Sequence, residues 1–302
     1  MHVLVAGSSG LIGQRLLSAL RGDGHEVSTL VRRDAASSSE VRWQPALGAD
    51  GVDDALRAVI ESADAVVNLA GSGVAEKRWN TTYKKQVLES RVTATQCLAT
   101  AISRSNNPPR VFVSGSAGGY YGDTGPVAVD ETAPRGSTFL AEVASAWEDA
   151  AAPALERGVR VVHPRTGTVA DAHGGAFGRL LPMIKSGAGG KLGNGHQWWS
   201  LISLRDEVAG ICHLIDTSSI SGGVNFSAPE QATNAQITDA LGAALHRPTL
   251  APAPKFAVRA VLGEFADELF IDQRMKPTKL LDSGFVFANP SLAMIVAGLL
   301  AD

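Results

Sequence analysis

The first two-thirds of the chain alternates between short runs of apolar residues and longer stretches in which apolar residues recur every three or four positions. The short runs predict buried β-strands and the periodic stretches predict amphipathic helices. Strands are expected at 3–5, 25–31, 41–43, 65–71, 111–114 and 159–162, and helices at 11–20, 53–61, 81–104 and 136–156. Because strands that alternate with helices form right-handed βαβ units, the pattern predicts an α/β fold with a doubly wound parallel sheet.

The pattern changes after residue 170, which suggests how the chain divides. Residues 1–170 are expected to form a dinucleotide-binding core, to which residues 201–228 return. The glycine-rich stretch 171–200 is expected to be a loop on the substrate side. Residues 229–302 are expected to form a smaller C-terminal lobe, with a proline-rich linker at 248–256, a short strand at 285–287 and a final helix.

Three glycines follow the first predicted strand and precede the first predicted helix, in the pattern G-x-x-G-x-x-G. Glycines at this point allow a sharp turn and a close approach of the backbone to a phosphate, which the helix N-terminus attracts. A tight turn that binds nothing is the alternative. The residues that this turn assigns to cofactor binding are Gly7, Ser9, Gly10, Leu11, Ile12 and Gly13.

The second predicted strand ends in Arg32 and Arg33, followed by Asp34. An acidic residue here is typical of NAD sites, whereas a guanidinium can grip the 2′-phosphate of NADP. The two arginines therefore predict NADP(H) as the cofactor. Asp34 leaves NAD(H) open, and a pair of solvated surface arginines is the further alternative.

Other strand ends meet the same edge of the predicted sheet, where ligands bind. The segment Asn68-Leu69-Ala70-Gly71 ends one of these strands, and its small residues allow the cofactor to lie close to the backbone at 69–71; a plain strand-ending turn is the alternative. Ser114 ends the next strand. Arg165 follows the strand at 159–162 and is expected to contact cofactor or substrate, with a structural ion pair as the alternative.

Composition and net charge exclude some classes of binding partner. The formal net charge is −3 and 45% of the residues are hydrophobic, so no nucleic-acid or anionic-membrane surface is implied. We expect a cytoplasmic monomer or homodimer that acts on a small molecule, because no apolar run reaches the roughly 18 residues of a membrane span and no signal peptide is evident. The two cysteines and the histidines show no metal-like spacing, so no metal site is expected.

Several long motifs resemble the extended short-chain dehydrogenases/reductases, and within them the atypical branch often labelled "epimerase family protein". The resemblance spans nearly the whole chain, and it implies a Rossmann core, NADP(H) binding and a C-terminal domain particular to the branch. The motifs are GSSGLIG (7–13), NLAG followed by KRWN (68–80), ESRVTAT (89–95), SGSAGGYYG (114–122), FLAEVASAWE (139–148), RTGTV (165–169), GAGGKLGNGHQWWS (187–200) and LGEFADEL with RMKPTKLLDSGFVF (262–287).

The resemblance to ordinary reductases breaks at the catalytic centre. Those enzymes use a Ser, a Tyr and Lys in YxxxK, and an Asn. Ser116 falls at the Ser position, but with Glu148 as the helix glutamate the Tyr and Lys positions fall on Leu140 and Ala144. Arg91 falls at the Asn position. Neither Leu140 nor Ala144 can transfer a proton, so a standard keto-reductase or sugar-nucleotide epimerase mechanism is not expected.

Tyr120 and Tyr121 follow Ser116 and are the candidates for the missing acid, with a pocket-wall role as the alternative. Arg91 is expected to hold a carboxylate or phosphate, of cofactor or substrate; an ion pair on the helix surface is equally open.

The residues expected to meet a substrate are Arg78, Trp79, Gln197 and Trp198. The first two belong to a basic and aromatic cluster that suits an anionic substrate, although a solvated helix face explains its lysines as well. The other two follow glycines that allow close approach, and they could equally plug the gap between two lobes.

These features favour an NADP(H)-dependent oxidoreductase acting on an unidentified small substrate. The missing Tyr, Lys and Asn keep open a non-catalytic NADP(H)-binding sensor or regulator. A nucleotide-sugar epimerase-like isomerase that uses its cofactor transiently is the third possibility.

Overall fold

The structure is a computed structural model that describes residues 1–46, 51–249 and 251–301. Its centre is a parallel sheet in which each neighbouring pair of strands runs in the same direction. In spatial order the strands are β11 (Gly222–Phe226), β7 (Arg160–Thr166), β5 (Val111–Ser114), β4 (Ala65–Asn68), β1 (His2–Ala6), β2 (Glu26–Val31) and β3 (Glu40–Arg42). The short β6 (Ser116–Ala117) pairs with β7 beside this path.

The strand order reverses at β1. The chain winds outward to β2 and β3, then returns to β4 on the other side of β1, and Ala6 lies opposite both Leu30 and Asn68. Ligands of doubly wound sheets bind where the order reverses, beyond the carboxyl ends of the strands. The predicted α/β fold with a doubly wound Rossmann sheet is confirmed.

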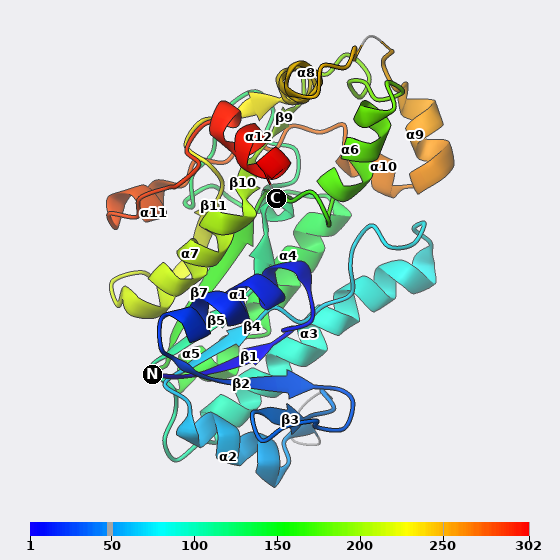
Figure 1. Cartoon of the computed structure of the whole chain (residues 1–302). Helices are drawn as coiled ribbons and strands as arrows, with labels where there is room; N and C mark the ends of the chain where they lie inside the picture. The colour runs from blue at the N-terminus through cyan, green and yellow to red at the C-terminus, as the bar shows by residue number, and fades with distance from the viewer. Residues whose placement is uncertain (47–50, 250, 302) are drawn as a thin grey trace.

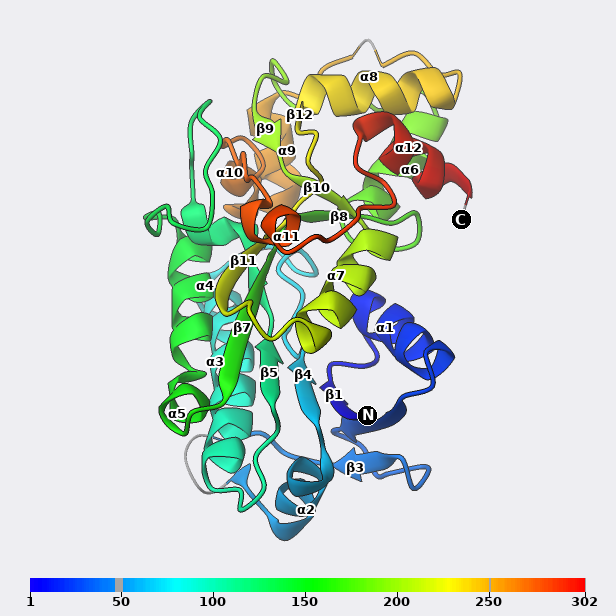
Figure 2. The same ribbon diagram turned by 90° about the vertical axis from the view of Figure 1, so that its left-hand side faces the viewer.

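Helices cover both faces of the sheet, as Figure 2 shows. On one face lie α1 (Leu11–Gly22) and α7 (Leu204–Asp216), packed on alternate strand residues such as Val3 and Val5. On the other lie α2 (Asp54–Ser62), α3 (Thr81–Ser103), α4 (Phe139–Asp149) and α5 (Ala152–Glu156). Leu4 and Ala6 face this second layer. Both faces of β1 are thus buried, which explains its continuous apolar run.

The remaining elements gather above the carboxyl ends of the strands (Figure 1). They have a core of their own, to which α6, α8 and α12 contribute. The elements are β8 (Thr168–Ala170), α6 (Phe177–Lys185), β9 (Trp198–Trp199), β10 (Leu201–Ser203), β12 (Ala232–Thr233), α8 (Asn234–Ala244), α9 (Lys255–Leu262), α10 (Phe265–Glu268), α11 (Thr278–Asp282) and α12 (Leu292–Ala301). No described helix is long and apolar enough to cross a membrane.

Two details of local structure differ from the expectations. The stretch 136–156, expected to hold a helix, holds two, α4 and α5, because Pro153 near the start of α5 cannot supply the backbone N–H that a continuous helix needs. Residues 285–287 form no strand: Phe285 and Phe287 pack on each other with ring centroids 4.8 Å apart, and no strand pairs with them.

The glycine-rich stretch 171–200 also holds more structure than a loop, since it contains α6 and β9. Phe177, Leu181 and Ile184 are buried on one side of α6, a helical spacing that the surrounding glycines obscured. Within the expected linker and lobe, residues 250 and 302 lie outside the described part of the chain.

Candidate functional site

In the glycine turn, the backbone at Gly7 and Gly13 lies very close to the backbone of neighbouring segments. Gly7 has φ of +81°, and a Cβ there would lie 2.5 Å from the carbonyl carbon of Leu69. A Cβ on Gly13 would lie 2.3 Å from the carbonyl oxygen of Gly7. Side chains at these two positions would therefore collide with the backbone of β4's end and of the turn itself.

The N-terminus of α1 carries no side-chain cap. Its N-cap is Gly10, and its first turn contains no acidic residue. By contrast, Asp53, Asn80 and Ser203 accept backbone N–H bonds at the starts of α2, α3 and α7. The amides at the start of α1, in the segment that includes Leu11 and Ile12, thus retain donors and a positive dipole end for a phosphate. This cradle fits a dinucleotide.

The two predicted 2′-phosphate ligands differ in their surroundings. Arg33 donates to both carboxylate oxygens of Glu40, at 2.7 and 2.5 Å, and that ion pair holds the pKa of Glu40 down to about 2. Asp34 is paired with Arg42 at 2.9 Å. Arg32 is exposed and has no hydrogen bond or ion pair to another described residue.

The end of β4 is held by a residue that the sequence reasoning did not assign to the site. The buried Asn68 amide donates to the Thr95 hydroxyl at 2.8 Å, and its carbonyl oxygen accepts from the Ala70 N–H at 3.1 Å. Asn68 therefore fixes the backbone of Leu69 and Ala70 against Gly7. Its place at the end of an apolar strand was the available signal.

A buried polar network joins β6, the end of β7 and β11. Arg165 donates to the two oxygens of Glu148 at 2.8 and 2.9 Å, and Ser116 donates to the same carboxylate at 2.7 Å. Arg165 also donates to the Tyr121 hydroxyl at 2.8 Å, which donates to Asn225 at 2.7 Å. Arg165 is thus engaged in an internal ion pair, the structural alternative left open by the sequence.

The two tyrosines have different environments. Tyr121 is buried, and burial raises the pKa of its phenol to about 12 despite the nearby Arg165. Tyr120 is half-buried, with its ring 3.4 Å from the Arg165 guanidinium carbon, and its hydroxyl makes no hydrogen bond within the described residues. Tyr121 is consequently a poor proton donor at neutral pH, whereas the hydroxyl of Tyr120 is uncommitted.

Leu140 lies at the same edge, on the first turn of α4. Its Cβ is 3.0 Å from the position that a Cβ on Gly119 would take, next to Tyr120. Ala144 follows one turn later and is buried. The face of α4 that points toward the strand ends is therefore apolar at both positions.

Arg91 extends from α3 to the end of β4. Its Nη1 donates to the carbonyl oxygens of Ser72 and Val87 at 2.8 and 3.0 Å, and its guanidinium carbon lies 5.0 Å from the centre of the Trp147 ring. Burial lowers the pKa of Arg91 to about 10. No described carboxylate lies within ion-pair distance of it, so the alternative of an ion pair on the helix surface is not seen among the described residues.

The predicted substrate residues pack between or within the lobes. Trp79 is buried, donates its Nε1 to the Val74 carbonyl, and contacts Phe139 and Phe265 with centroids 5.2 and 5.3 Å away. The side chain of Arg78 passes Gly263. These contacts join the start of α3 to α10.

Gln197 and Trp198 also have structural partners. The buried Gln197 amide donates to the carbonyls of Leu192 and Leu269, and the Trp198 ring lies 3.8 Å from the guanidinium carbon of Arg274. These contacts are the kind expected if Gln197 and Trp198 pack inside the protein and do not face a substrate. The structure does not bring these two residues into contact with Arg78 or Trp79.

A buried carboxyl that the sequence did not single out lies beneath the end of β7. Glu207 on α7 accepts from the Thr166 hydroxyl at 2.7 Å, and its second oxygen has no partner among the described residues. Burial raises the pKa of Glu207 to about 8. It is therefore mostly protonated at neutral pH.

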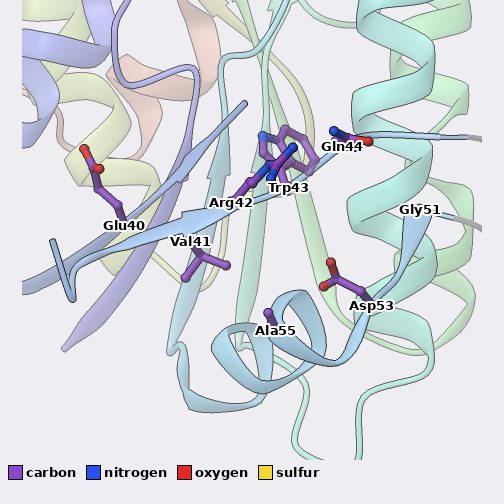
Figure 3. Close-up of a pocket in the computed structure, with 8 residues that line it drawn as sticks. All are labelled: Glu40, Val41, Arg42, Trp43, Gln44, Gly51, Asp53 and Ala55. Carbon is purple, nitrogen blue, oxygen red and sulfur yellow. The ribbon is translucent and has the colours of Figure 1, made fainter. Parts of the chain in front are cut away.

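A pocket of about 640 Å³ lies elsewhere on the molecule (Figure 3). It opens between β3 and α2, and none of the predicted site residues lines it. Its lining residues are Glu40, Val41, Arg42, Trp43, Gln44, Gly51, Asp53 and Ala55. Among the described residues, no group of three His, Cys, Asp or Glu side chains is placed to hold a metal ion.

Comparison with known proteins agrees with this geometry. Residues 3–226 match the model of the NAD dependent epimerase/dehydratase family, and residues 253–297 match a domain of unknown function, DUF1731. An epimerase family protein of Mycobacterium leprae is 42% identical over 96% of this chain and 92% of its own length.

Solved structures give the same result. The crystal structure of human epimerase family protein SDR39U1 with NADPH has a TM-score of 0.90 and 33% identity, and the alignment covers 100% of both chains. A nucleoside-diphosphate sugar epimerase from Corynebacterium glutamicum has a TM-score of 0.80 and 31% identity over 99% of this chain and 58% of that one. The resemblance drawn from the motifs is confirmed: this chain belongs to the NAD dependent epimerase/dehydratase family, within the group named epimerase family proteins.

Proposed function

We propose that this chain binds NADP(H) across the carboxyl ends of β1, β2 and β4 and is an oxidoreductase that acts on a small molecule. The observation that carries the proposal is the uncapped start of α1, whose amides have no side-chain acceptor, at a turn where Gly7 and Gly13 allow the backbone to pack closely. The uncommitted Arg32 supports the preference for the 2′-phosphate. The NADPH in the human relative agrees with this assignment.

The chain's own residues then have distinct roles. The α1 amides bind the phosphates, and Asn68 holds the backbone against which the cofactor lies. Bound NADPH supplies a hydride. The Ser116 hydroxyl already donates its proton to Glu148, so it is free only to accept a hydrogen bond from a substrate. We assign Tyr120 as the proton donor, because Tyr121 is held between Arg165 and Asn225.

A second function is favoured by one observation. Leu140 and Ala144 leave α4 without a proton donor, and the sole buried phenol of the pair has a raised pKa. These features support an NADP(H)-binding sensor or regulator that performs no chemistry.

Two measurements separate these functions. Titration of the four nicotinamide dinucleotides, followed by tryptophan fluorescence, is expected to show tighter binding of NADPH and NADP than of NADH and NAD. NADPH oxidation is then measured with a panel of carbonyl compounds for the wild type, Tyr120→Phe and Tyr121→Phe. Turnover that is lost in Tyr120→Phe and retained in Tyr121→Phe supports the oxidoreductase. Tight binding without any turnover supports the regulator, and no binding overturns both.

A further inference from the structure

Two neighbouring side chains at the carboxyl ends of β4 and β5 carry hydrogen-bond donors that have no described acceptor: one is buried and the other is half-buried. One is the Trp147 indole N–H, which belongs to a side chain that is 7% exposed and has no acceptor among the described residues. The other is the guanidinium of Arg91, which stacks near that indole ring. Only Nη1 of Arg91 has hydrogen-bond acceptors among the described residues, and both are neutral carbonyl oxygens.

A partly buried cation without a close counter-ion is unfavourable. Paired charges and satisfied donors are the rule inside proteins, and an uncompensated charge that has lost most of its water destabilises the fold. Elsewhere in this protein the rule holds, since the buried Arg165 has Glu148. Arg91 departs from it at the edge of the sheet where ligands bind, because no described carboxylate lies within ion-pair distance and Glu76 only raises its pKa from farther away. The close partner is therefore expected to be a ligand's anion.

The surroundings fit such a group. A Cβ on Gly71 would lie 3.1 Å from Cγ of Arg91, and a Cβ on Gly115 would lie 2.8 Å from Cζ2 of Trp147. Cζ2 is on the edge of the indole that also carries Nε1. The two glycines thus let both side chains pack directly against the backbone at the ends of β4 and β5, the edge where ligands of a parallel sheet bind.

We propose that Arg91 and Trp147 form a receptor for an oxyanion, a carboxylate or phosphate group, at the carboxyl ends of β4 and β5. The planar guanidinium offers Nε and Nη2 to two oxygens of one anion, and the indole N–H adds a third donor. The anion belongs either to the substrate, which would make the substrate class anionic, or to the phosphates of the cofactor. The proposed function matters to this inference only in deciding whether the anion comes from the substrate or from the cofactor.

The test is calorimetric titration of inorganic phosphate, and separately of malonate, into the protein alone and into the protein saturated with NADPH. The variants are Arg91→Gln, which removes the charge, and Trp147→Phe, which removes the indole N–H and keeps an aromatic ring. Arg104→Gln is the matched control, because it removes an exposed charge at the end of the same helix.

We expect at least one anion to bind the wild type and Arg104→Gln, and to bind Arg91→Gln at least about tenfold more weakly, since a charge-assisted bidentate contact is lost. Trp147→Phe is expected to show a smaller loss. If the anion still binds the NADPH-saturated protein, and Arg91→Gln leaves NADPH affinity unchanged, the receptor is for substrate. If NADPH excludes the anion, and Arg91→Gln weakens NADPH binding about tenfold, it is for the cofactor.

Two results would overturn the receptor: wild-type protein that binds neither anion, or binding that is equal in Arg91→Gln and Arg104→Gln. If Arg91→Gln fails to fold, Arg91→Lys replaces it, because lysine keeps the positive charge but cannot make the bidentate contact. Unchanged anion affinity in both Arg91→Lys and Trp147→Phe would count against the proposal. Failure of wild-type protein to bind NADPH refutes the proposed cofactor and leaves the anion titration of the free protein interpretable.

Discussion

Arg165 on β7 donates to both carboxylate oxygens of Glu148 on α4, at 2.8 and 2.9 Å, and the two side chains are only 6% and 12% exposed. The pair fixes α4 against the end of the sheet. The same carboxylate orients Ser116. The network therefore has a structural role, and by binding the hydroxyls of Ser116 and Tyr121 it determines which hydrogen bonds they can still make.

Removing one partner of this pair should be costly. Glu148→Gln leaves the Arg165 guanidinium buried without its charge partner, and we expect a loss of about 3–5 kcal/mol in the free energy of unfolding, measured by urea denaturation. Glu142→Gln, on the exposed side of the same helix, is the control and should change stability by less than about 0.5 kcal/mol. Equal effects of the two substitutions would refute this role of the pair.

Glu207 should make stability depend on pH. Its pKa is raised to about 8 in the folded protein, so between its unfolded value near 4.5 and about 8 the folded state holds a proton that the unfolded state has lost. Stability should therefore fall as pH rises through this window, by about 1.4 kcal/mol per pH unit from this group alone.

The variant Glu207→Gln keeps an acceptor for Thr166 and cannot ionise. Urea denaturation of wild type and variant between pH 5 and 8 should show a stability difference that moves in favour of the variant as pH rises. Parallel stability curves across this range would mean that Glu207 is ionised in the folded protein.

Cofactor selectivity should depend on one arginine of the pair. Arg32→Ala is expected to weaken NADPH binding by at least about tenfold and to leave NADH binding nearly unchanged, because only NADPH carries the 2′-phosphate. Arg33→Ala is the matched control, since Arg33 is engaged by Glu40. Fluorescence titration of both cofactors measures these affinities, and an equal effect of the two substitutions on NADPH would contradict the assignment.

The sequence predicted the elements whose signals are local. The strand runs, the glycine turn and the reductase-like motifs are patterns of residues that are neighbours in the sequence, and they predicted β1, α1 and a doubly wound parallel sheet. Pro153 was a local signal too, and its effect on the helix at 136–156 was overlooked.

The partners of side chains could not be predicted in the same way. Nothing near Arg165 in sequence indicates Glu148, seventeen residues away, or Asn225 as the acceptor of the Tyr121 hydroxyl. The raised pKa of Glu207 and the unpartnered Trp147 N–H depend on burial that only tertiary packing creates. The different roles of Arg32 and Arg33 likewise depend on tertiary structure, because β3 places Glu40 beside Arg33.

The glycine turn offers the sharpest test of the cofactor site, because α1 contains two glycines with opposite surroundings. Gly13→Ala places a Cβ 2.3 Å from the carbonyl oxygen of Gly7, so the turn must shift and NADPH affinity should fall by at least about tenfold. Gly22→Ala, at the other end of the helix, meets nothing within 4 Å and should leave affinity unchanged while stability rises by up to about 1 kcal/mol. Titration with NADPH and thermal unfolding separate the two effects. If Gly13→Ala folds and binds NADPH as tightly as Gly22→Ala does, the phosphate does not lie at the start of α1, and the cofactor site must be sought elsewhere on the sheet.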